Sequence, residues 1–452
     1  MNNTIVRFSL VLMFLGFFIG CGDTKKKEIP QSVEIKTDIV LDSFFKALHD
    51  KGMFNGAVGV KKEGKLILKK GYGTANFSME TPFLAETAME VASVSKQFTA
   101  FAILLLEQEK KLSLEDHLQK YLGDDFPYAN ITIKHILTHT SGLPDYESHF
   151  RKTWDTTKIT TNSDIVRYFK LDKPQLISQP GTKYHYSNSG YILLAEIVHA
   201  VSGKPLDEYL KDQVFNVAEM KNTAFYDRDE IWKLTDYAPG YLINPETCQH
   251  DRPEDQAGKY YYHFLSGRLG SGRLSSSVDD LIKWDSILYT NRLLHEKGKE
   301  LTFQAYPPKE DPSDYGFGWH IVENDSLGKV VYHTGSWAGN LAYIKRYLDD
   351  KSLVVILNNT YSPYIKKIRK AVGDYLNGKP LQFPQQIGND ILKKEICHLN
   401  KEKMKSWYEK YLDAQWHVTD LESLSKQYTK LGLEDKAALV DIITNFVKSD
   451  NQ

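Results

Sequence analysis

A serine and a lysine stand three residues apart at the start of a long apolar segment. Ser93 and Lys96 lie just ahead of the apolar run at 101–108, and a serine in that position is a helix-start signal. Residues i and i+3 of a helix share one face. The positive end of the helix favours negative charge that develops on the serine oxygen, or on the oxygen of a carbonyl group that the serine attacks. The pattern therefore predicts a serine nucleophile with a lysine partner.

The Ser-x-x-Lys pattern is short, and the chain contains it twice. Ser423 and Lys426 form a second copy inside an amphipathic run with Leu421, Leu424 and Tyr428 at helical spacing, which predicts a solvated helix face. The first copy is distinguished by two motifs that follow it. These are Tyr186-x-Asn188, in a turn-rich loop before the buried helix expected at 191–198, and His333-Thr334-Gly335 in an expected strand. Residues 128–130 and 289–291 also match Tyr-x-Asn, and residues 62–64 and 430–432 match Lys-x-Gly, the commoner relative of the His-Thr-Gly motif. Order along the chain and surroundings therefore decide which copies are chosen.

The elements around these motifs predict an α+β fold. A helix is expected at 40–48, and a hairpin at 54–60 and 66–73. Residues 110–300 are mostly helices and loops. Strands are then expected at 315–322, 329–336, 341–347 and 353–357, with a helix at 365–376. If the early strands join the late ones in one antiparallel sheet flanked by helices, the middle forms a mostly helical lobe. The cleft between sheet and lobe is then the natural site.

The first residues have the pattern of a signal peptide. The apolar core at 8–20 is shorter than the roughly 20 residues that a membrane span needs, and it fits a signal sequence. Its end, Gly20-Cys21, resembles the bacterial lipoprotein cleavage box. We therefore expect cleavage of residues 1–20, a lipid anchor on Cys21 and a polar tether at 21–37. Ordinary secretion with a free Cys21 is the alternative.

The last part of the chain predicts a small helical appendage. Three amphipathic stretches follow Gly378, near 387–412, 421–431 and 436–447. Thr419 and Glu422 predict a capping box at the start of the second stretch. The predicted domains are thus a hydrolase-like domain at 38–376 and an appendage at 377–452, in which no catalytic pattern is visible.

Composition excludes some classes of function. The net charge of −1 gives no electrostatic case for binding nucleic acid. The three cysteines form no metal-binding cluster. His135 and His139 are four residues apart on a helix expected to end at Gly142, but they lack the intervening glutamate and a third ligand. We interpret them as structural and expect no metal and no cofactor.

Taken together, the motifs resemble the serine β-lactamase and penicillin-binding-protein superfamily, and most closely its branch of class C β-lactamases and D,D-peptidases or esterases. The resemblance covers roughly residues 38–376 and implies the same sheet-plus-lobe fold. The stretches that carry it are Ser93 to Ala100, Thr138 to Pro144, Pro180-Gly181-Thr182 with Tyr186-Ser187-Asn188, Tyr315 to Trp319, and His333-Thr334-Gly335.

The resemblance implies a role for each site residue. Ser93 is the acylated nucleophile, and the proton acceptor is Lys96 or Tyr186, a choice that the sequence leaves open. Asn188 hydrogen-bonds the substrate amide or Lys96. The remaining residues are implied in the oxyanion hole and substrate wall: the backbone N–H groups of Ser93 and Ser336, and the strand residues His333, Thr334 and Gly335.

One departure bears on the substrate. Related β-lactamases usually have lysine where this chain has His333, and a neutral imidazole, with an ordinary pKa of about 6.5, holds a substrate carboxylate poorly. We therefore expect an exported, membrane-anchored serine hydrolase of the cell envelope, acting on a D-amino-acid peptide, a β-lactam or a small ester, with efficient β-lactam hydrolysis disfavoured. The alternative is a non-catalytic binding or sensor protein that retains the cleft.

Overall fold

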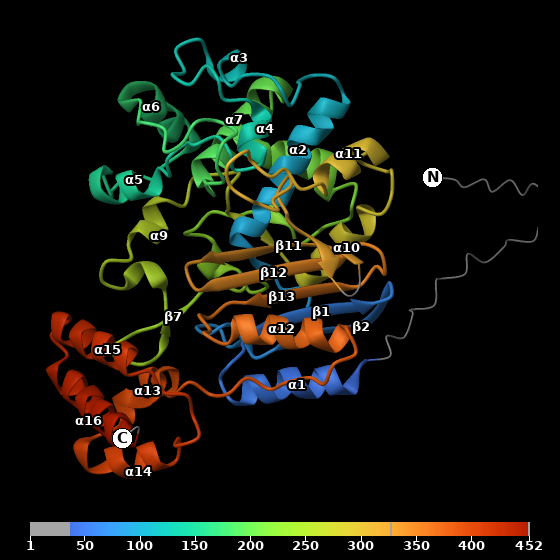
Figure 1. Cartoon of the computed structure of the whole chain (residues 1–452). Helices are drawn as coiled ribbons and strands as arrows, with labels where there is room; N and C mark the ends of the chain where they lie inside the picture. The colour runs from blue at the N-terminus through green and yellow to red at the C-terminus, as the bar shows by residue number, and fades with distance from the viewer. Residues whose placement is uncertain (1–36, 326–327, 451–452) are drawn as a thin grey trace, which may run out of the picture. The chain divides into compact units, whose positions relative to one another are not determined.

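A six-stranded antiparallel sheet forms the centre of the fold, in the order β10-β11-β12-β13-β1-β2 (Figure 1). Its strands are β1 (Gly56–Lys62), β2 (Lys65–Tyr72), β10 (His320–Asp325), β11 (Gly328–Trp337), β12 (Asn340–Tyr347) and β13 (Leu353–Asn358). The early hairpin joins the late strands because β1 pairs with β13, with Gly56 opposite Asn358. The predicted α+β fold is confirmed.

Both faces of the sheet are covered by helices. In β13, Val354 and Ile356 belong to a core shared with α1 (Ile39–Asp50) and α12 (Ile365–Leu376). Val355 and Leu357 belong to the larger core on the other face, since successive side chains of a strand point to opposite faces. All six residues of β13 are therefore buried.

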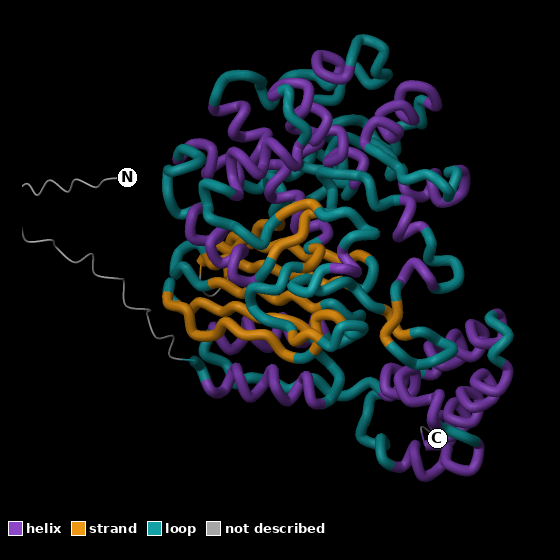
Figure 2. Tube along the Cα trace, turned by 180° about the vertical axis from the view of Figure 1, so that it is seen from behind, coloured by secondary structure: helices purple, strands orange, loops and turns teal. Residues whose placement is uncertain are grey.

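The helical lobe lies on the side of the sheet that carries the larger core. Figure 2 shows the strands gathered between this lobe and α1. The helices between β5 and β10 in the chain are α2 (Lys96–Gln108), α3 (Gln119–Leu122), α4 (Ile133–Leu137), α5 (Glu147–Thr153), α6 (Asn162–Asp172), α7 (Asn188–Ser202), α8 (Leu206–Leu210), α9 (Tyr261–Phe264), α10 (Val278–Ile287) and α11 (Glu296–Thr302). Helix α2 is buried from Lys96 to Leu106, so it is the lobe's central helix.

Three small sheets complete the body. They are β3 (Thr74–Asn76) with β4 (Thr81–Pro82), β5 (Met89–Glu90) and β6 (Ala224–Phe225) on either side of β9 (Leu274–Ser276), and β7 (Leu242–Ile243) with β8 (His250–Asp251). The sheet of β5, β9 and β6 leads directly into the turn that carries Ser93.

Four helices follow the last strand and α12. They are α13 (Gly388–Glu395), α14 (Met404–Glu409), α15 (Val418–Lys430) and α16 (Glu434–Asp450), and they pack around a small core of their own that includes Leu392, Met404 and Val440. The predicted capping box is wrong, because α15 begins one residue before Thr419 and is preceded by His417. The stretch expected at 387–412 is interrupted by two short 3₁₀ turns.

Two further expectations are corrected. Helix α4 ends at Leu137, well before Gly142, because His139 already has a left-handed φ of 57°. The strand expected at 315–322 begins only at His320. Gly318, with φ 81°, lies so close to the start of α2 that a Cβ there would be 2.8 Å from the Gln97 Cα.

The structure, a computed structural model, describes residues 37–325 and 328–450. The predicted signal peptide, the predicted lipidation site at Cys21 and the tether up to residue 36 lie outside the described residues. Among the helices that are described, none has the length and apolar character needed to cross a membrane.

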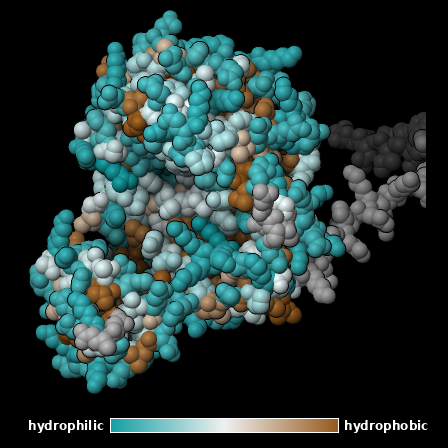
Figure 3. Space-filling model, in the orientation of Figure 1, coloured by the Kyte–Doolittle hydropathy of each residue, from teal (hydrophilic) through white to brown (hydrophobic). Residues whose placement is uncertain are grey.

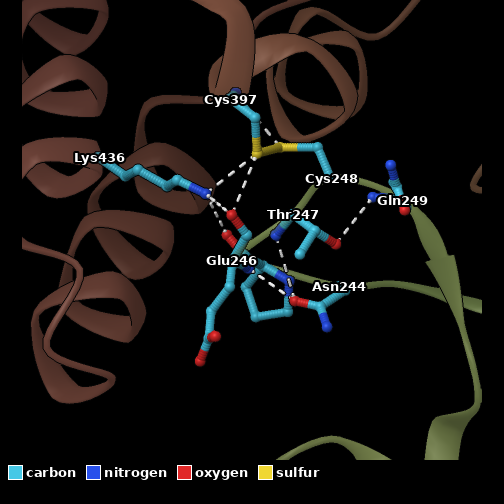
Figure 4. Close-up of a disulfide and its surroundings, with 8 residues drawn as sticks. Asn244, Glu246, Thr247, Cys248, Gln249, Cys397 and Lys436 are labelled. Carbon is cyan, nitrogen blue, oxygen red and sulfur yellow. Dashed lines mark hydrogen bonds between the residues drawn. A yellow bond between two sulfur atoms is a disulfide. The ribbon is translucent and has the colours of Figure 1, made fainter.

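A disulfide that the sequence analysis did not predict joins Cys248 to Cys397 (Figure 4). It links the loop of the β7–β8 hairpin to the 3₁₀ turn that follows α13. Lys436 of α16 reinforces this link, since its Nζ donates to the carbonyl oxygens of Pro245 (2.7 Å) and Glu246 (2.6 Å). The tip of this hairpin is thus tied to the C-terminal helices.

A buried ion cluster ties α10 to the sheet and gives a stability prediction. Asp285 accepts from Lys61 of β1 (2.9 Å) and from Arg346 of β12 (2.7 Å), and Arg346 is fully buried. Asp285→Ala leaves two cations without their carboxylate, so we expect the free energy of unfolding to fall by about 3–5 kcal/mol in a urea titration. The control is Asp374→Ala, whose lysine partners are exposed, with an expected loss below about 1 kcal/mol. Equal losses would contradict the prediction.

Candidate active site

A tight turn presents Ser93 at the start of α2. Residues Ala92–Ser95 form a 3₁₀ helix, η1, that runs directly into α2, so the expected helix start near Ser93 is found. Ala92 has a left-handed φ of 47°. The Ser95 hydroxyl donates to the Ala92 carbonyl oxygen (2.6 Å) and accepts from the Leu274 N–H (3.2 Å). These bonds hold the turn in a conformation that a non-glycine residue adopts at some cost.

Lys96 is the most enclosed polar group of the site. Its side chain is fully buried, and Nζ lies 3.2 Å from Ser93 Oγ, 2.8 Å from Asn188 Oδ1 and 2.7 Å from the Ser271 carbonyl oxygen. Burial, followed by the positive charge of Arg268, lowers the pKa of Lys96 to about 7. A neutral amine is therefore accessible at physiological pH within reach of the serine proton.

The ring of Tyr186 packs against the Lys96 amine. Its ring centroid is 4.8 Å from Lys96 Nζ and 4.2 Å from the ring of His139. Although 37 % of the surface of Tyr186 is exposed, desolvation raises the pKa of its hydroxyl, and the hydrogen bond with Ser93 offsets this only in part. The phenol is therefore protonated at neutral pH.

The two histidines interpreted as structural have separate surroundings. His135 completes the capping box of α4, where its Nδ1 accepts from the Thr132 N–H (3.2 Å). His139 Nδ1 accepts from the Ser187 N–H (3.1 Å), and burial keeps the pKa of His139 well below its usual value. His139 thus supports Tyr186 as a neutral, packed ring.

His333 lies behind the wall of the site. Its side chain is buried, the Tyr315 hydroxyl donates to Nε2 (3.0 Å), and Nδ1 donates to the Thr334 carbonyl oxygen (2.7 Å). Burial, and then the charges of His320 and Lys96, hold the pKa of His333 well below its usual value. The imidazole is neutral and both nitrogens are engaged. The expected contact of His333 with substrate stays a prediction. The imidazole has no free ring nitrogen with which to make it.

Gly335 brings β11 against the serine turn. A Cβ at this position would lie 2.1 Å from the Val91 carbonyl oxygen and 3.2 Å from the Ser93 backbone nitrogen, so only glycine fits. Ser336, the next residue, is exposed and lines the same pocket as Ser93. The backbone N–H groups of Ser93 and Ser336 stay the predicted oxyanion hole.

Gly335→Ala is expected to lower kcat/KM for a small ester about 100-fold or more, because the added methyl group must displace the serine turn, and errors of about 1 Å in an active site cost about that much. The control is Gly378→Ala, a glycine with left-handed φ but nothing within 4 Å. It should lose stability without losing kcat/KM. Steady-state kinetics and thermal unfolding of both variants check this. A Gly335→Ala enzyme with unchanged kcat/KM would refute the close approach.

Ser93 opens into a polar pocket of about 290 Å³. The residues that line it are Glu90, Ala92, Ser93, Glu147, Arg151, Asn188, Tyr262, Arg268, Ser271, Gly272, Ser336 and Trp337. Three residues of the predicted set, Ser93, Asn188 and Ser336, therefore line one pocket. Lys96 and Tyr186 do not line it, but both contact Ser93.

Sequence reasoning missed the charged part of this lining. Glu147 accepts from Arg268 (3.3 Å) and from Arg151 (3.2 Å), and the Arg268 guanidinium lies 4.1 Å from the Trp337 ring centroid. Arg268 is buried, and its Nε has no hydrogen-bond partner among the described residues. These residues have no fixed spacing from the motifs. The glycines on either side of Ser271 were the only local signal.

The fold and this site together define a serine-hydrolase architecture of the β-lactamase and penicillin-binding-protein type. The family model described as Beta-lactamase matches residues 41–375, so the chain belongs to the β-lactamase family. Helices α13–α16 lie beyond the matched residues.

Individual relatives agree with this assignment. Penicillin-binding protein 4* of Bacillus subtilis is 33 % identical over 350 residues, which cover 76 % of this chain and 77 % of that protein. Teichoic acid D-alanine hydrolase of Staphylococcus aureus is 25 % identical over 324 residues, covering 72 % and 75 %. The solved structure of an octameric penicillin-binding protein homologue from Pyrococcus abyssi has a TM-score of 0.64 and 28 % identity, covering 75 % of this chain and 77 % of that one.

Proposed function

We propose that this protein hydrolyses an amide or ester through an acyl intermediate on Ser93. The observation that carries the proposal is the 3.2 Å contact between Ser93 Oγ and Lys96 Nζ, an amine whose pKa is lowered to about 7. A serine hydroxyl needs a nearby base to become a nucleophile, and a buried amine that is partly neutral at pH 7 meets that need.

The steps follow from these positions. Ser93 Oγ attacks the substrate carbonyl carbon as its proton passes to Lys96, and the N–H groups of Ser93 and Ser336 stabilise the oxyanion. When the tetrahedral intermediate collapses, the bond to the leaving group breaks and the leaving group takes a proton from the site. Water then attacks the acyl-Ser93 ester by the same route, which releases the acid and regenerates the serine.

Lys96 rather than Tyr186 is the proposed base. The raised pKa of Tyr186 makes the phenol a proton donor at neutral pH, suited to passing a proton between Ser93 and the leaving group. Asn188 Oδ1 holds the Lys96 amine at 2.8 Å. This contact favours Lys96, one of the two partners that the resemblance implied, as the partner of Asn188.

The proposed substrate is a D-alanyl ester or peptide rather than a β-lactam to be turned over. The name of one relative, a teichoic acid D-alanine hydrolase, points to this class. The neutral, engaged His333 supports it. Arg151 and Arg268 are the cations among the described residues that line the pocket, and they would receive a substrate carboxylate.

Export and anchoring form part of the proposal. The Cys248–Cys397 disulfide favours an oxidising compartment, and this agrees with a signal peptide and a lipid on Cys21. Metabolic labelling with a radioactive fatty acid tests the anchor: the wild-type chain should incorporate label and Cys21→Ser should not. Equal labelling of both chains would refute anchoring at Cys21.

Intact-mass spectrometry tests the acyl intermediate. The chain from Glu28 onward contains every residue that the structure describes, and these residues fall in one compact unit. It is incubated with benzylpenicillin and, separately, with p-nitrophenyl acetate, with Ser93→Ala as the control. An adduct that is absent from the control supports the proposal. If the wild-type chain forms no adduct with either probe and turns over neither of them, the result supports the binding or sensor alternative instead.

A further inference from the structure

A second cavity, of about 410 Å³, lies where the C-terminal helices meet the body of the protein. Its walls include residues of the α1–β1 connection, of β3 and the turn after it, of the β7–β8 hairpin, and of α13 and α15. The space-filling view shows the surface hollowed between the C-terminal helices and the body, with apolar residues inside the hollow (Figure 3). No lining residue is shared with the Ser93 pocket, so a molecule held here is out of reach of the nucleophile.

One wall of this cavity is a fixed aromatic surface. Phe77 and His250 stack with ring centroids 4.2 Å apart, and Tyr241 meets Phe77 edge to face at 4.8 Å. The Tyr241 hydroxyl donates to Asn76 Oδ1 (3.3 Å) and accepts from the Phe77 N–H (3.2 Å). Burial lowers the pKa of His250 to about 4, so its ring is uncharged at neutral pH. Rings held in this way favour a flat apolar group.

The charged residues of the lining are predominantly positive. They are Lys259, Lys393 and Lys394 against a single acid, Asp390. Asp390 is already paired with Lys394 (2.7 Å). Neither Lys259 nor Lys393 forms an ion pair with any carboxylate of the described residues. The cavity thus combines apolar rings with two unpaired ammonium groups, which is complementary to an anion.

Cross-links hold the walls together. Lys394 of α13 donates to the Gly52 carbonyl oxygen (2.8 Å), and the Cys248–Cys397 disulfide ties the hairpin to the end of α13 (Figure 4). A site whose walls are fixed in this way does not need to be assembled by its ligand, which lowers the cost of binding.

We propose that this cavity is a binding site for a small organic anion that has an aromatic or acyl body and one carboxylate, sulfonate or phosphate group. The body lies against Phe77, His250 and Tyr241, and the anionic group lies at Lys259 and Lys393. The site is separate from the proposed hydrolysis, and its ligand is bound without being converted.

Fluorescence titration tests the site with two matched probes. 8-Anilinonaphthalene-1-sulfonate has an apolar two-part body and a sulfonate, and N-phenyl-1-naphthylamine has the same body without the charge. The protein is the chain from Glu28 onward. We expect Lys259→Gln/Lys393→Gln to weaken binding of the sulfonate probe about tenfold and to change binding of the neutral probe less than twofold. The control, Lys62→Gln/Lys405→Gln, removes two exposed lysines outside the cavity and should change neither.

A blocking variant locates the probe. Gln427 is exposed on α15 and lines the cavity, so Gln427→Trp puts an indole into the space without disturbing the core. It should abolish binding of both probes and leave the thermal unfolding midpoint within a few degrees of wild type. Sulfonate binding that survives Gln427→Trp, or that is insensitive to the two lysines, would overturn the proposal. So would a wild-type chain that does not bind the sulfonate probe.

Discussion

Replacing Ser93 by alanine is expected to lower kcat/KM for p-nitrophenyl acetate by a factor on the order of 10⁴ to 10⁶, the range found when a serine nucleophile is removed. The loss is large because Ser93 Oγ is the oxygen that lies 3.2 Å from Lys96 Nζ, and alanine has no oxygen with which to form the acyl intermediate. Folding should be almost unchanged, since the hydroxyl contacts only the polar groups of the pocket. Steady-state hydrolysis at pH 8 and thermal unfolding measure the two effects.

The chain supplies its own control for this experiment. Ser423 has the same Ser-x-x-Lys spacing, but it lies on the exposed face of α15, where its hydroxyl donates to the Thr419 carbonyl oxygen (2.8 Å). Ser423→Ala should therefore keep wild-type activity. A Ser93→Ala protein that keeps more than a few per cent of the activity, or a Ser423→Ala protein that loses it, would refute the assignment of the nucleophile.

The sequence predicted the parts of the site that local geometry determines. Ser93 and Lys96 are one turn apart, so their contact follows once the helix start is recognised. The meeting of Tyr186 and Asn188 with Lys96 depends on how α7 packs against α2, and periodicity carries no information about that. For those residues the family resemblance supplied what the pattern could not.

The residues that were missed act through tertiary neighbours. Arg268 affects Lys96 only because the fold brings a buried guanidinium close to it. The disulfide joins cysteines 149 residues apart, and no spacing rule pairs so distant positions. The same holds for the second cavity, whose lining residues are spread along the chain from His49 to Tyr428.

Boundary errors have a common physical cause. Residues around His139 and Gly318 have helical or strand-like patterns, yet both segments leave regular structure to pack against the start of α2 or against Tyr186. Contacts with the active-site helix therefore overrode local propensity in these segments. Such departures are expected near functional sites, where local and global preferences conflict.

The pH dependence of hydrolysis should report Lys96. The amine accepts a proton only when it is neutral, and its lowered pKa is about 7. Below that pH the group is protonated and inactive as a base, so kcat/KM for a neutral ester should rise with pH and level off above an inflection near 7. Arg268→Gln removes the positive charge that helps to lower this pKa, so the inflection should move to higher pH. An inflection that stays in place would contradict the role of Arg268.

Substitution of Lys96 itself separates a base from a mere cation. Lys96→Arg keeps a positive charge near Ser93, but a guanidinium is not deprotonated in this pH range. We expect kcat/KM to fall about 10³- to 10⁴-fold at every pH and the inflection near 7 to disappear. Lys426→Arg, on the exposed second copy of the motif, is the matched control and should be neutral. If Lys96→Arg retained the inflection, the titrating base would have to be another group, and the pKa of Tyr186, raised by desolvation, makes the phenol a poor candidate. A Lys96→Arg protein that kept its activity would show that the site needs only positive charge at this position, and the proposed proton transfer from Ser93 to Lys96 would be wrong.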